Sequence, residues 1–334
     1  MFVGMNYAWR NYAWDFGLPP TSDAGTPWGR RAAWTTTIED ELKEFGVLGL
    51  KVLRWFLIGD GTTLGTGDHK PEKDPHRPGQ WRFHQVPELS PEFLDDFAQL
   101  LLFCERADIQ LLPSILDFHF CFPAVPVEGS PIVKCGRIDA LIDPHKRQQL
   151  LDRLVDPILA VCQRFPKTVY AVEIINEPEW CTDDGLWADE KKAVPLVAMQ
   201  DFVTEGAKRI NRAGFLSTVG FAKHRSMMAW ESIALGLTLH QFHYYVDPDA
   251  VPQNNMRDFG PCIVGEFPSA RWKSWPELGT EQDTRSRLSY LERKGYDGAL
   301  LWSANREEEK IAEPVVEWSE RVKDEVSSYL SRRD

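Results

Sequence analysis

Two glutamates that follow apolar, strand-like runs are the strongest chemical signal in this sequence. The run over residues 168–176 leads directly into Glu177, and the run over residues 261–266 ends at Glu266. Retaining hydrolysis of a glycosidic bond requires one carboxyl group that donates a proton and a second that attacks carbon, roughly 5 Å apart. The pair therefore predicts one proton donor and one nucleophile, if folding brings Glu177 and Glu266 face to face.

These two roles require different protonation states at neutral pH. A proton donor needs a pKa well above that of a free glutamate, which apolar surroundings and a nearby negative charge provide. Glu266 is expected to supply that charge to Glu177, while Arg54 and Tyr245 are expected to keep Glu266 ionised. The structural alternatives are a cap of the loop that begins at Pro178 for Glu177, and a structural salt bridge at the strand end for Glu266.

Six further residues at or near the ends of strand-like runs have side chains that hold sugars or tune acids. They are Arg54, His119, Asn176, His243, Tyr245 and Trp302. Amides at strand ends can bond sugar hydroxyls, and an indole can lie under a sugar ring. Arg54 lies in an otherwise apolar strand and needs an anionic partner, which is either Glu266 or the more deeply placed Glu173. Each of the six also has a structural alternative as a turn, core or ion-pairing residue.

Tryptophans follow both catalytic strands. They are Trp180, Trp187, Trp272 and Trp275. Indole rings stack on sugars and also fill protein cores, so the sequence is equally consistent with both roles.

Eight strand-like segments alternate with helix-like segments along the whole chain. The expected strands are residues 2–7, 50–58, 109–116, 168–176, 215–221, 237–243, 261–266 and 296–303. Eight strands that are each followed by a helix predict a single (β/α)8 TIM barrel, with residues 1–334 as one catalytic domain. A doubly wound sheet is the weaker alternative, because no GxGxxG turn follows the first strand.

The helix-like segments differ in length. Ser90 and Pro91 provide an N-cap and a first-turn proline for one helix. Residues 144–164 have the apolar spacing of one continuous helix, whereas residues 226–234 and 251–259 predict two short ones.

Residues 59–89 form the longest insertion, after the second strand. In a barrel this loop lies at the C-terminal ends of the strands, where chemistry is placed. It is therefore expected to shape a substrate cleft.

The ordered set of strand-end residues resembles glycoside hydrolase family 5 and its relatives in clan A. The family pattern is Arg on strand two, His after strand three, Asn-Glu-Pro after strand four, His-x-Tyr after strand six, Gly-Glu-aromatic on strand seven and Trp on strand eight. This sequence matches the pattern in order, from Arg54 to Trp302. The resemblance implies a retaining β-glycosidase, cellulase-like or mannanase-like, that acts by double displacement through a covalent glycosyl-enzyme intermediate. It implies Glu177 as acid and base, Glu266 as nucleophile, and no cofactor.

The composition restricts the partners. The formal charge of 38 − 50 = −12 disfavours nucleic acids and anionic membranes, whereas a carbohydrate substrate is compatible with it. No apolar run approaches the length of a membrane span. No zinc or EF-hand spacing is present, so no metal is expected.

The N-terminal residues lack a signal-peptide pattern, which predicts a cytoplasmic location, or secretion if Met1 replaces a removed signal. The six cysteines predict free thiols, with a Cys121–Cys135 pair as the alternative in a secreted protein.

Several alternatives stay open from the sequence. A sugar hydroxyl in place of water would capture the same intermediate and make the protein a transglycosylase. A catalytically silent carbohydrate-binding barrel is disfavoured, because both glutamates are present. A metal-dependent barrel hydrolase is disfavoured, because the first strand, residues 3–7, offers no His-x-His ligands. The sugar, the linkage, the choice between endo and exo action and the oligomeric state are not specified.

Overall fold

Eight parallel strands form one sheet around the core of the protein. The computed structural model describes residues 1–9, 15–17, 31–64, 71–74, 79–126, 133–183, 194–245, 250–268, 275, 278, 283–304 and 318–332. The strands, in their order in the sheet, are β10 (His240–His243), β11 (Cys262–Pro268), β12 (Gly298–Trp302), β1 (Phe2–Asn6), β2 (Val52–Gly59), β5 (Gln110–Asp117), β8 (Val172–Asn176) and β9 (Ser217–Gly220). All eight predicted strands are confirmed.

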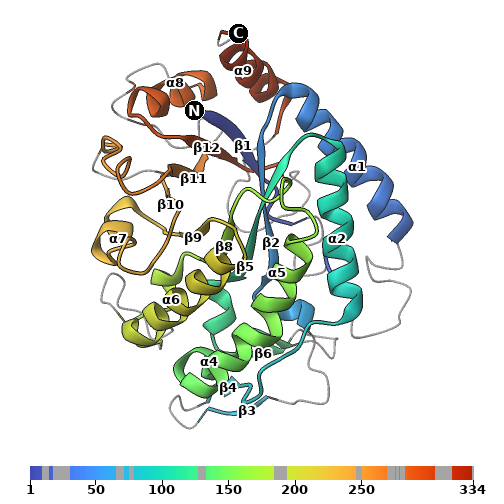
Figure 1. Cartoon of the computed structure of the whole chain (residues 1–334), viewed down its shortest axis with the longest axis vertical. Helices are drawn as coiled ribbons and strands as arrows, with labels where there is room; N and C mark the ends of the chain where they lie inside the picture. The colour runs from blue at the N-terminus through green and yellow to red at the C-terminus, as the bar shows by residue number, and fades with distance from the viewer. Residues whose placement is uncertain are drawn as a thin grey trace.

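The two ends of this sheet meet and close it into a barrel. The backbone N–H of His243 donates to the carbonyl of Phe221 at 2.8 Å, and a parallel bridge joins Phe221 to Phe242. Helices lie around the outside of the strands (Figure 1). The predicted (β/α)8 TIM barrel is therefore confirmed.

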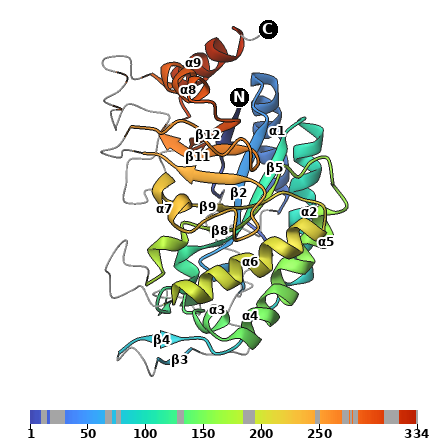
Figure 2. The same ribbon diagram turned by 60° about the vertical axis from the view of Figure 1, so that its left-hand side comes forward.

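Figures 1 and 2 show the long helices α1, α2 and α6, and the shorter α5, on the outer side of the sheet, with α8 and α9 near the N-terminus. The helices are α1 (Arg31–Leu48), α2 (Pro91–Arg106), α3 (Asp139–Ile142), α4 (Pro144–Leu150), α5 (Asp156–Cys162), α6 (Leu196–Arg212), α7 (His224–Ala229), α8 (Thr284–Arg293) and α9 (Glu320–Leu330). The expected start of α2 is confirmed, because the Ser90 hydroxyl accepts a hydrogen bond from Phe93 N at 3.2 Å. Phe93 and Phe97 on its inner face are buried, and each stabilises the fold by about 1.5–3 kcal/mol.

The predicted helix over residues 144–164 contains an irregular turn. A π-helical segment, Leu151–Val155, separates α4 from α5. Pro157 lies in the first turn of α5 and has no N–H to donate, which interrupts the regular ladder at that point.

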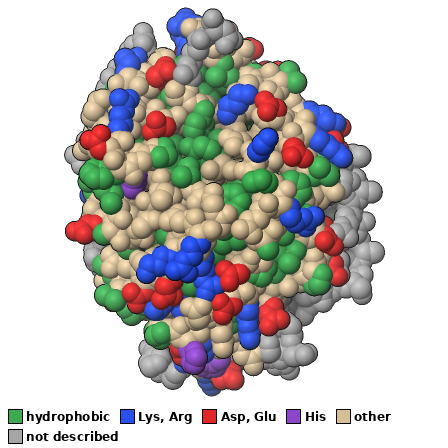
Figure 3. Space-filling model, in the orientation of Figure 1, with side chains coloured by type: hydrophobic (Ala, Val, Ile, Leu, Met, Phe, Trp, Pro, Cys, Tyr) green, Lys and Arg blue, Asp and Glu red, His purple; other side chains and the backbone are tan. Residues whose placement is uncertain are grey.

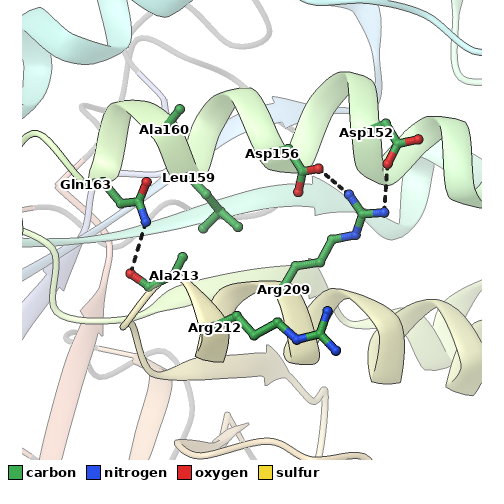
Figure 4. A pocket seen from close by; sticks show the side chains of 8 residues that line it. All are labelled: Asp152, Asp156, Leu159, Ala160, Gln163, Arg209, Arg212 and Ala213. Carbon is green, nitrogen blue, oxygen red and sulfur yellow. Dashed lines mark hydrogen bonds and ion pairs between the residues drawn. The ribbon is translucent and has the colours of Figure 1, made fainter.

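A groove on the outside of the barrel runs between α5 and α6 (Figure 4). Arg209 from α6 bridges two carboxylates of the facing helix, donating to Asp152 at 2.7 Å and to Asp156. Gln163 Nε2 donates to the carbonyl of Ala213 at 3.4 Å near the far end of the groove. These contacts join two neighbouring helices of the outer layer, and none involves a predicted site residue.

Two short hairpins extend the barrel at the loops after β2 and β5. One pairs β3 (Glu72–Lys73) with β4 (Trp81–Arg82), and the other pairs β6 (Val125–Pro126) with β7 (Val133–Lys134). The N–H of Ala124 donates to the carbonyl of Trp81 at 2.8 Å and so connects the two hairpins. Residues 59–89 are thus partly ordered into strand, which their weak periodicity did not predict.

The predicted short helix over residues 251–259 is wrong. This segment holds only a turn before β11. The side chain of Asn254 takes the place of helical hydrogen bonds, since it accepts from Met256 N at 3.0 Å and donates to Gly295 O at 2.9 Å.

Within the described residues, no helix is long and apolar enough to cross a membrane. On the face shown in Figure 3, basic and acidic side chains are interspersed. All six cysteines are buried and free, so the alternative pair between Cys121 and Cys135 is not formed.

Candidate active site

The guanidinium of Arg54 organises the interior of the barrel at the C-terminal ends of the strands. Its Nε and Nη2 donate to the two carboxylate oxygens of Glu173 at 2.7 and 2.6 Å. Its Nη1 donates to Asn6 Oδ1 at 2.9 Å and to Glu266 Oε1 at 2.7 Å. A second bond from Nη2 reaches Asn176 Oδ1 at 2.7 Å. All five N–H donors of this buried side chain are thus used, and both acids that the sequence offered as partners bind it.

Loss of this cation should destabilise the protein strongly. Burial alone would lower the pKa of Arg54, but the carboxylates of Glu173 and Glu266 raise it, so the side chain is always charged. We expect Arg54→Ala to reduce the free energy of unfolding by about 3–5 kcal/mol, because Glu173 would be left buried without a counter-charge. Urea denaturation followed by circular dichroism measures this loss. Arg54→Lys serves as a comparison, because it keeps the charge and loses the paired hydrogen bonds. Equal stability of the alanine variant and the wild type would contradict the prediction.

A β-bulge turns Glu266 into the barrel. Phe242 pairs with Val264 and the next residue, His243, pairs with Glu266, so β11 has one extra residue at Gly265. A Cβ atom built on Gly265 would lie 2.6 Å from Gln241 Nε2, which shows that this position also faces the interior. Two consecutive residues share one face only because the bulge breaks the alternation of the strand.

A second irregularity presents Asn176 and Glu177. The register between β8 and β9 shifts between Glu173 and Asn176. The side chains of Glu173 and Asn176 therefore both reach Arg54, although the two residues are three positions apart. Glu177 then has the left-handed backbone conformation, with φ 43° and ψ 50°. Its N–H donates to the carbonyl of Gly220 at 2.7 Å, which holds this uncommon conformation in place.

Among the described residues, the hydrogen-bond partners of the Glu177 carboxyl group are neutral side chains. Its Oε1 lies 2.7 Å from His243 Nδ1, and its Oε2 accepts from Trp180 Nε1 at 2.8 Å. Burial raises the pKa of Glu177 to about 7, and the carboxylate of Asp117 adds to the rise. Asp117, on the neighbouring strand β5, is thus a second negative charge that raises this pKa, in addition to the expected repulsion between Glu177 and Glu266.

Glu266 has a different environment. Its Oε1 accepts from the Arg54 guanidinium, and its Oε2 accepts from the Tyr245 hydroxyl at 2.6 Å. Burial raises the pKa of Glu266 and the nearby Glu177 adds to the rise, whereas His243, Arg54 and Tyr245 oppose it. One oxygen of Glu266, one of Glu177 and a ring nitrogen of His243 all lie within 4.8 Å of one another. The structure thus brings the two predicted catalytic carboxyls face to face at the separation typical of a retaining pair.

His243 and Tyr245 complete the contacts between the two acids. Burial lowers the pKa of His243 to about 4, so its imidazole is neutral at neutral pH. Its Nδ1 is 3.5 Å from Glu266 Oε2, in addition to its contact with Glu177. Burial and the adjacent Glu266 raise the pKa of Tyr245, which therefore stays protonated and donates. Among the two tyrosines of this segment, Tyr245 and not Tyr244 faces the acid.

His119 belongs to a chain of polar groups that ends at Asn176. Its Nδ1 and its backbone N–H both contact Asp117 Oδ1, and Asp117 Oδ2 accepts from Asn176 Nδ2 at 2.8 Å. Burial alone would lower the pKa of His119, but Asp117 outweighs it and raises the pKa. The half-exposed imidazole stacks on Phe118 with ring centroids 4.0 Å apart.

The tryptophans separate into two groups. Trp302 lies at the end of β12, in register with Asn6 on β1 and Pro268 on β11, and is partly exposed at the mouth of the barrel. Trp180 is partly exposed beside Glu177, whereas Trp275 is fully buried and donates to the carbonyl of Tyr245 at 3.1 Å. Trp275 therefore supports the site from the core and is not a sugar-stacking wall. Trp187 and Trp272 lie outside the described residues.

Solved structures with the same architecture are known. A β-mannanase from the blue mussel Mytilus edulis superposes with a TM-score of 0.64 at 19% identity, covering 98% of this chain and 91% of that one. An endo-1,4-β-mannanase from Eisenia fetida gives 0.66 at 18% identity, with 98% and 90% covered. The chain has the fold of the β-mannanases.

A more distant structure of the same fold is GH5_18 from Streptomyces cattleya in complex with Manβ1-4GlcNAc, with a TM-score of 0.62 at 11% identity and 99% and 79% of the chains covered. The resemblance to family 5 and clan A inferred from the strand-end residues is confirmed at the level of fold by these neighbours. No profile of a known protein family matches the sequence, and no curated protein sequence matches it.

Within this mannanase-like barrel, sequence reasoning missed several residues of the site. Ser114 and Gln241 both donate to Glu173 at 2.7 Å, and Asn6 fixes Arg54 from the first strand. Asp117 could have been found, since it ends a strand two residues before His119. Asn6 likewise ends a strand, whereas Ser114 and Gln241 lie inside strands, where a single polar residue gives no signal of the partner it will meet.

The donor set for a metal ion in this part of the chain is Glu177, His243 and Glu266. Two carboxylates and an imidazole are ligands that zinc accepts. However, the charge of Glu266 is already compensated by Arg54 at 2.7 Å, and its other oxygen is bound by Tyr245. The arrangement therefore suits a substrate that reacts between two carboxyls better than a resident dication.

Proposed function

We propose that this protein is a retaining glycoside hydrolase that cleaves a β-linked glycoside or oligosaccharide by double displacement. The observation that supports this function is the opposed pair of Glu177 and Glu266, with carboxylate oxygens within 4.8 Å and unlike surroundings. Retaining enzymes hold their carboxyls about 5–5.5 Å apart, whereas inverting enzymes leave room for a water at roughly 6.5–9.5 Å. The proposed catalytic unit is one barrel domain that includes the whole chain.

The surroundings of the two acids assign their roles. Two carboxyls this close lose their protons in separate steps. The first negative charge is stabilised best on Glu266, beside the Arg54 guanidinium and the Tyr245 hydroxyl. The remaining proton stays on Glu177, which has no cation partner among its described contacts. Glu266 is thus the nucleophile, and Glu177 is the acid.

In the first step, a Glu266 oxygen attacks the anomeric carbon while Glu177 protonates the departing oxygen. The covalent glycosyl ester forms with inverted configuration, and the aglycone leaves as an alcohol. In the second step, ionised Glu177 takes a proton from water, which attacks the same carbon and releases Glu266. Asn176 is positioned by Arg54 and Asp117 to donate its second Nδ2 proton to the neighbouring sugar hydroxyl. His119 and Trp302 bind the sugar at the two sides of the mouth.

The neighbours of this fold favour β-mannosides as the first substrates to test. The experiment is to incubate the wild type with aryl β-glycosides and with β-1,4-linked manno-, gluco- and mixed oligosaccharides, and to follow the products by chromatography. We expect cleavage of at least one β-linked series and none by Glu266→Ala. Products longer than the substrate would indicate that a sugar hydroxyl captures the intermediate. No cleavage in any series would contradict the proposed function.

The activity should fall as the pH rises through neutrality. Glu177 must be protonated in the free enzyme, and its pKa is about 7, so kcat/KM should decline above that pH. Asp117→Asn removes the charge that helps to raise this pKa, and the alkaline limb of the profile should therefore move to lower pH. Asp95→Asn, an exposed position on α2, is the matched control and should leave the profile unchanged. An alkaline limb that is the same in Asp117→Asn and the wild type would show that Asp117 does not tune the acid.

A further inference from the structure

A second carboxyl group is buried beside the proposed acid and takes no part in the chemistry above. Glu179 follows Glu177 by two residues, lies in the short 3-10 helix η4 (Pro178–Trp180), and has no exposed surface. Among the described residues, no cation contacts its carboxyl group. Buried carboxylates are normally paired, so an unpaired one needs a physical reason.

The hydrogen bonds of Glu179 join two separate turns. Both of its carboxyl oxygens accept from the N–H of Ala222, at 3.1 and 3.3 Å, in the loop that follows β9. The same two segments are joined by the bond from Glu177 N to the carbonyl of Gly220 at 2.7 Å. Two links therefore hold the left-handed turn of Glu177 against the end of β9. Removing one would leave an uncommon backbone conformation supported by a single bond.

The surroundings indicate that the Glu179 carboxyl is protonated when it accepts the hydrogen bonds from Ala222. Among the described residues, the groups that face its carboxyl are Glu177, the thiol of Cys181 and the hydroxyl of Ser226 on α7, and none of them carries a positive charge. The buried hydroxyl of Ser226 is next to the Glu179 carboxyl and can accept the proton of its neutral form. Burial raises the pKa of Glu179 to about 8, and Glu177 adds to the rise.

We propose that Glu179 is a positioning residue of the reaction, whose neutral, buried carboxyl fastens the turn that carries Glu177 to the turn after β9. This inference rests on the proposed glycosidase function. The role of Glu179 is to keep the Glu177 carboxyl next to the position of the leaving oxygen. A displacement of a catalytic group by about 1 Å can lower the rate by 10²-fold. Glutamine at this position is a mimic of the protonated acid, because its oxygen can accept from Ala222 and its amide can donate to Ser226.

The kinetic test compares Glu179→Gln and Glu179→Ala with the wild type at pH 6, on β-1,4-mannotetraose and on 2,4-dinitrophenyl β-mannoside. The dinitrophenolate leaves without a proton, so it does not need a well-placed acid. We expect Glu179→Gln to keep kcat/KM within about threefold on both substrates. We expect Glu179→Ala to lower kcat/KM on mannotetraose by about 30-fold or more and to lower it less than about threefold on the aryl mannoside, because kcat/KM reports the first step, in which only the poor leaving group needs the acid. An equal loss on both substrates, or no loss on either, would overturn the proposal.

A second measurement does not depend on activity. The native state binds the Glu179 proton more tightly than the unfolded chain, so the stabilisation from this group is complete below about pH 4.5 and is lost as the pH rises through 8. The Tm of the wild type should therefore fall relative to that of Glu179→Gln between pH 5 and pH 9. Glu105→Gln, exposed on α2, is the control and should follow the wild type at every pH.

Parallel Tm curves for the wild type and Glu179→Gln would overturn the proposal even if Glu179→Ala fails to fold. A wild type that cleaves neither mannoside nor any other β-glycoside contradicts the proposed function, while the Tm curves still decide whether Glu179 links the two turns in its neutral form.

Discussion

Replacing Glu266 by alanine should lower kcat/KM by roughly 10⁴–10⁶-fold on every substrate, the range found when a catalytic nucleophile is removed. The group that attacks carbon is then missing, while Arg54 keeps its bonds to Glu173, Asn176 and Asn6 and so preserves the barrel interior. Steady-state kinetics with an activated aryl β-glycoside measure the loss. The change in Tm should be small by comparison, because the guanidinium retains one buried carboxylate.

Azide offers a sharper test of the same residue. The small cavity left by Glu266→Ala should admit azide or formate on the face from which the carboxylate attacked. With azide and an activated β-glycoside we expect partial recovery of the rate and an α-glycosyl azide as product. Glu266→Asp is the matched comparison, because it keeps the carboxylate on a side chain that is shorter by one methylene. We expect this variant to retain more activity than Glu266→Ala in the absence of azide. Residual activity of the alanine variant within tenfold of the wild type would show that Glu266 is not the nucleophile.

Replacing Glu177 by alanine should have an effect that depends on the leaving group. General acid catalysis contributes about 10²–10⁴-fold, so cleavage of an unactivated oligosaccharide should fall by that factor. A dinitrophenyl glycoside needs no protonation, and its first step should stay close to the wild-type rate. Stopped-flow measurement of dinitrophenolate release should then show a fast burst followed by slow turnover, because the base for the second step is also missing.

Glu177→Gln separates the proton from the shape of the side chain. It keeps the contacts to His243 and Trp180 but cannot donate an acidic proton. We expect it to match the alanine variant on oligosaccharides. Equal losses on activated and unactivated substrates in both variants would rule out the acid role and indicate a structural one.

The strands were predictable because of where they lie. Strands of a barrel are buried on both faces, so they appear in the sequence as nearly continuous apolar runs, and all eight were found. The polar residues that interrupt or end those runs were predictable for the same reason, since Arg54, Glu173 and Glu266 each needed a buried partner. Parallel strands end at one edge of the sheet, which is why residues far apart in the chain meet there.

The remaining features depend on contacts that a single sequence does not reveal. Strand alternation would place Gly265 and Glu266 on opposite faces, and only the bulge against His243 brings both inside. The charge next to Glu177 comes from Asp117, because the register of β5 with β8 places Asp117 opposite Asn176. Trp180 and Trp275 each follow a strand that carries one of the two acids, yet tertiary packing exposes the first and buries the second.

The central claim is that Glu177 and Glu266 act on one anomeric carbon in two successive displacements. Proton NMR of the reaction on a β-glycoside cleaved by the wild type tests it most directly, because the anomeric signal of the first product is recorded before mutarotation. Because oxygens of the two carboxyls lie within 4.8 Å of each other, we expect the β-anomer to appear first and the α-anomer only later, as the sugar equilibrates. Immediate appearance of the α-anomer would mean a single displacement by water and would contradict the account.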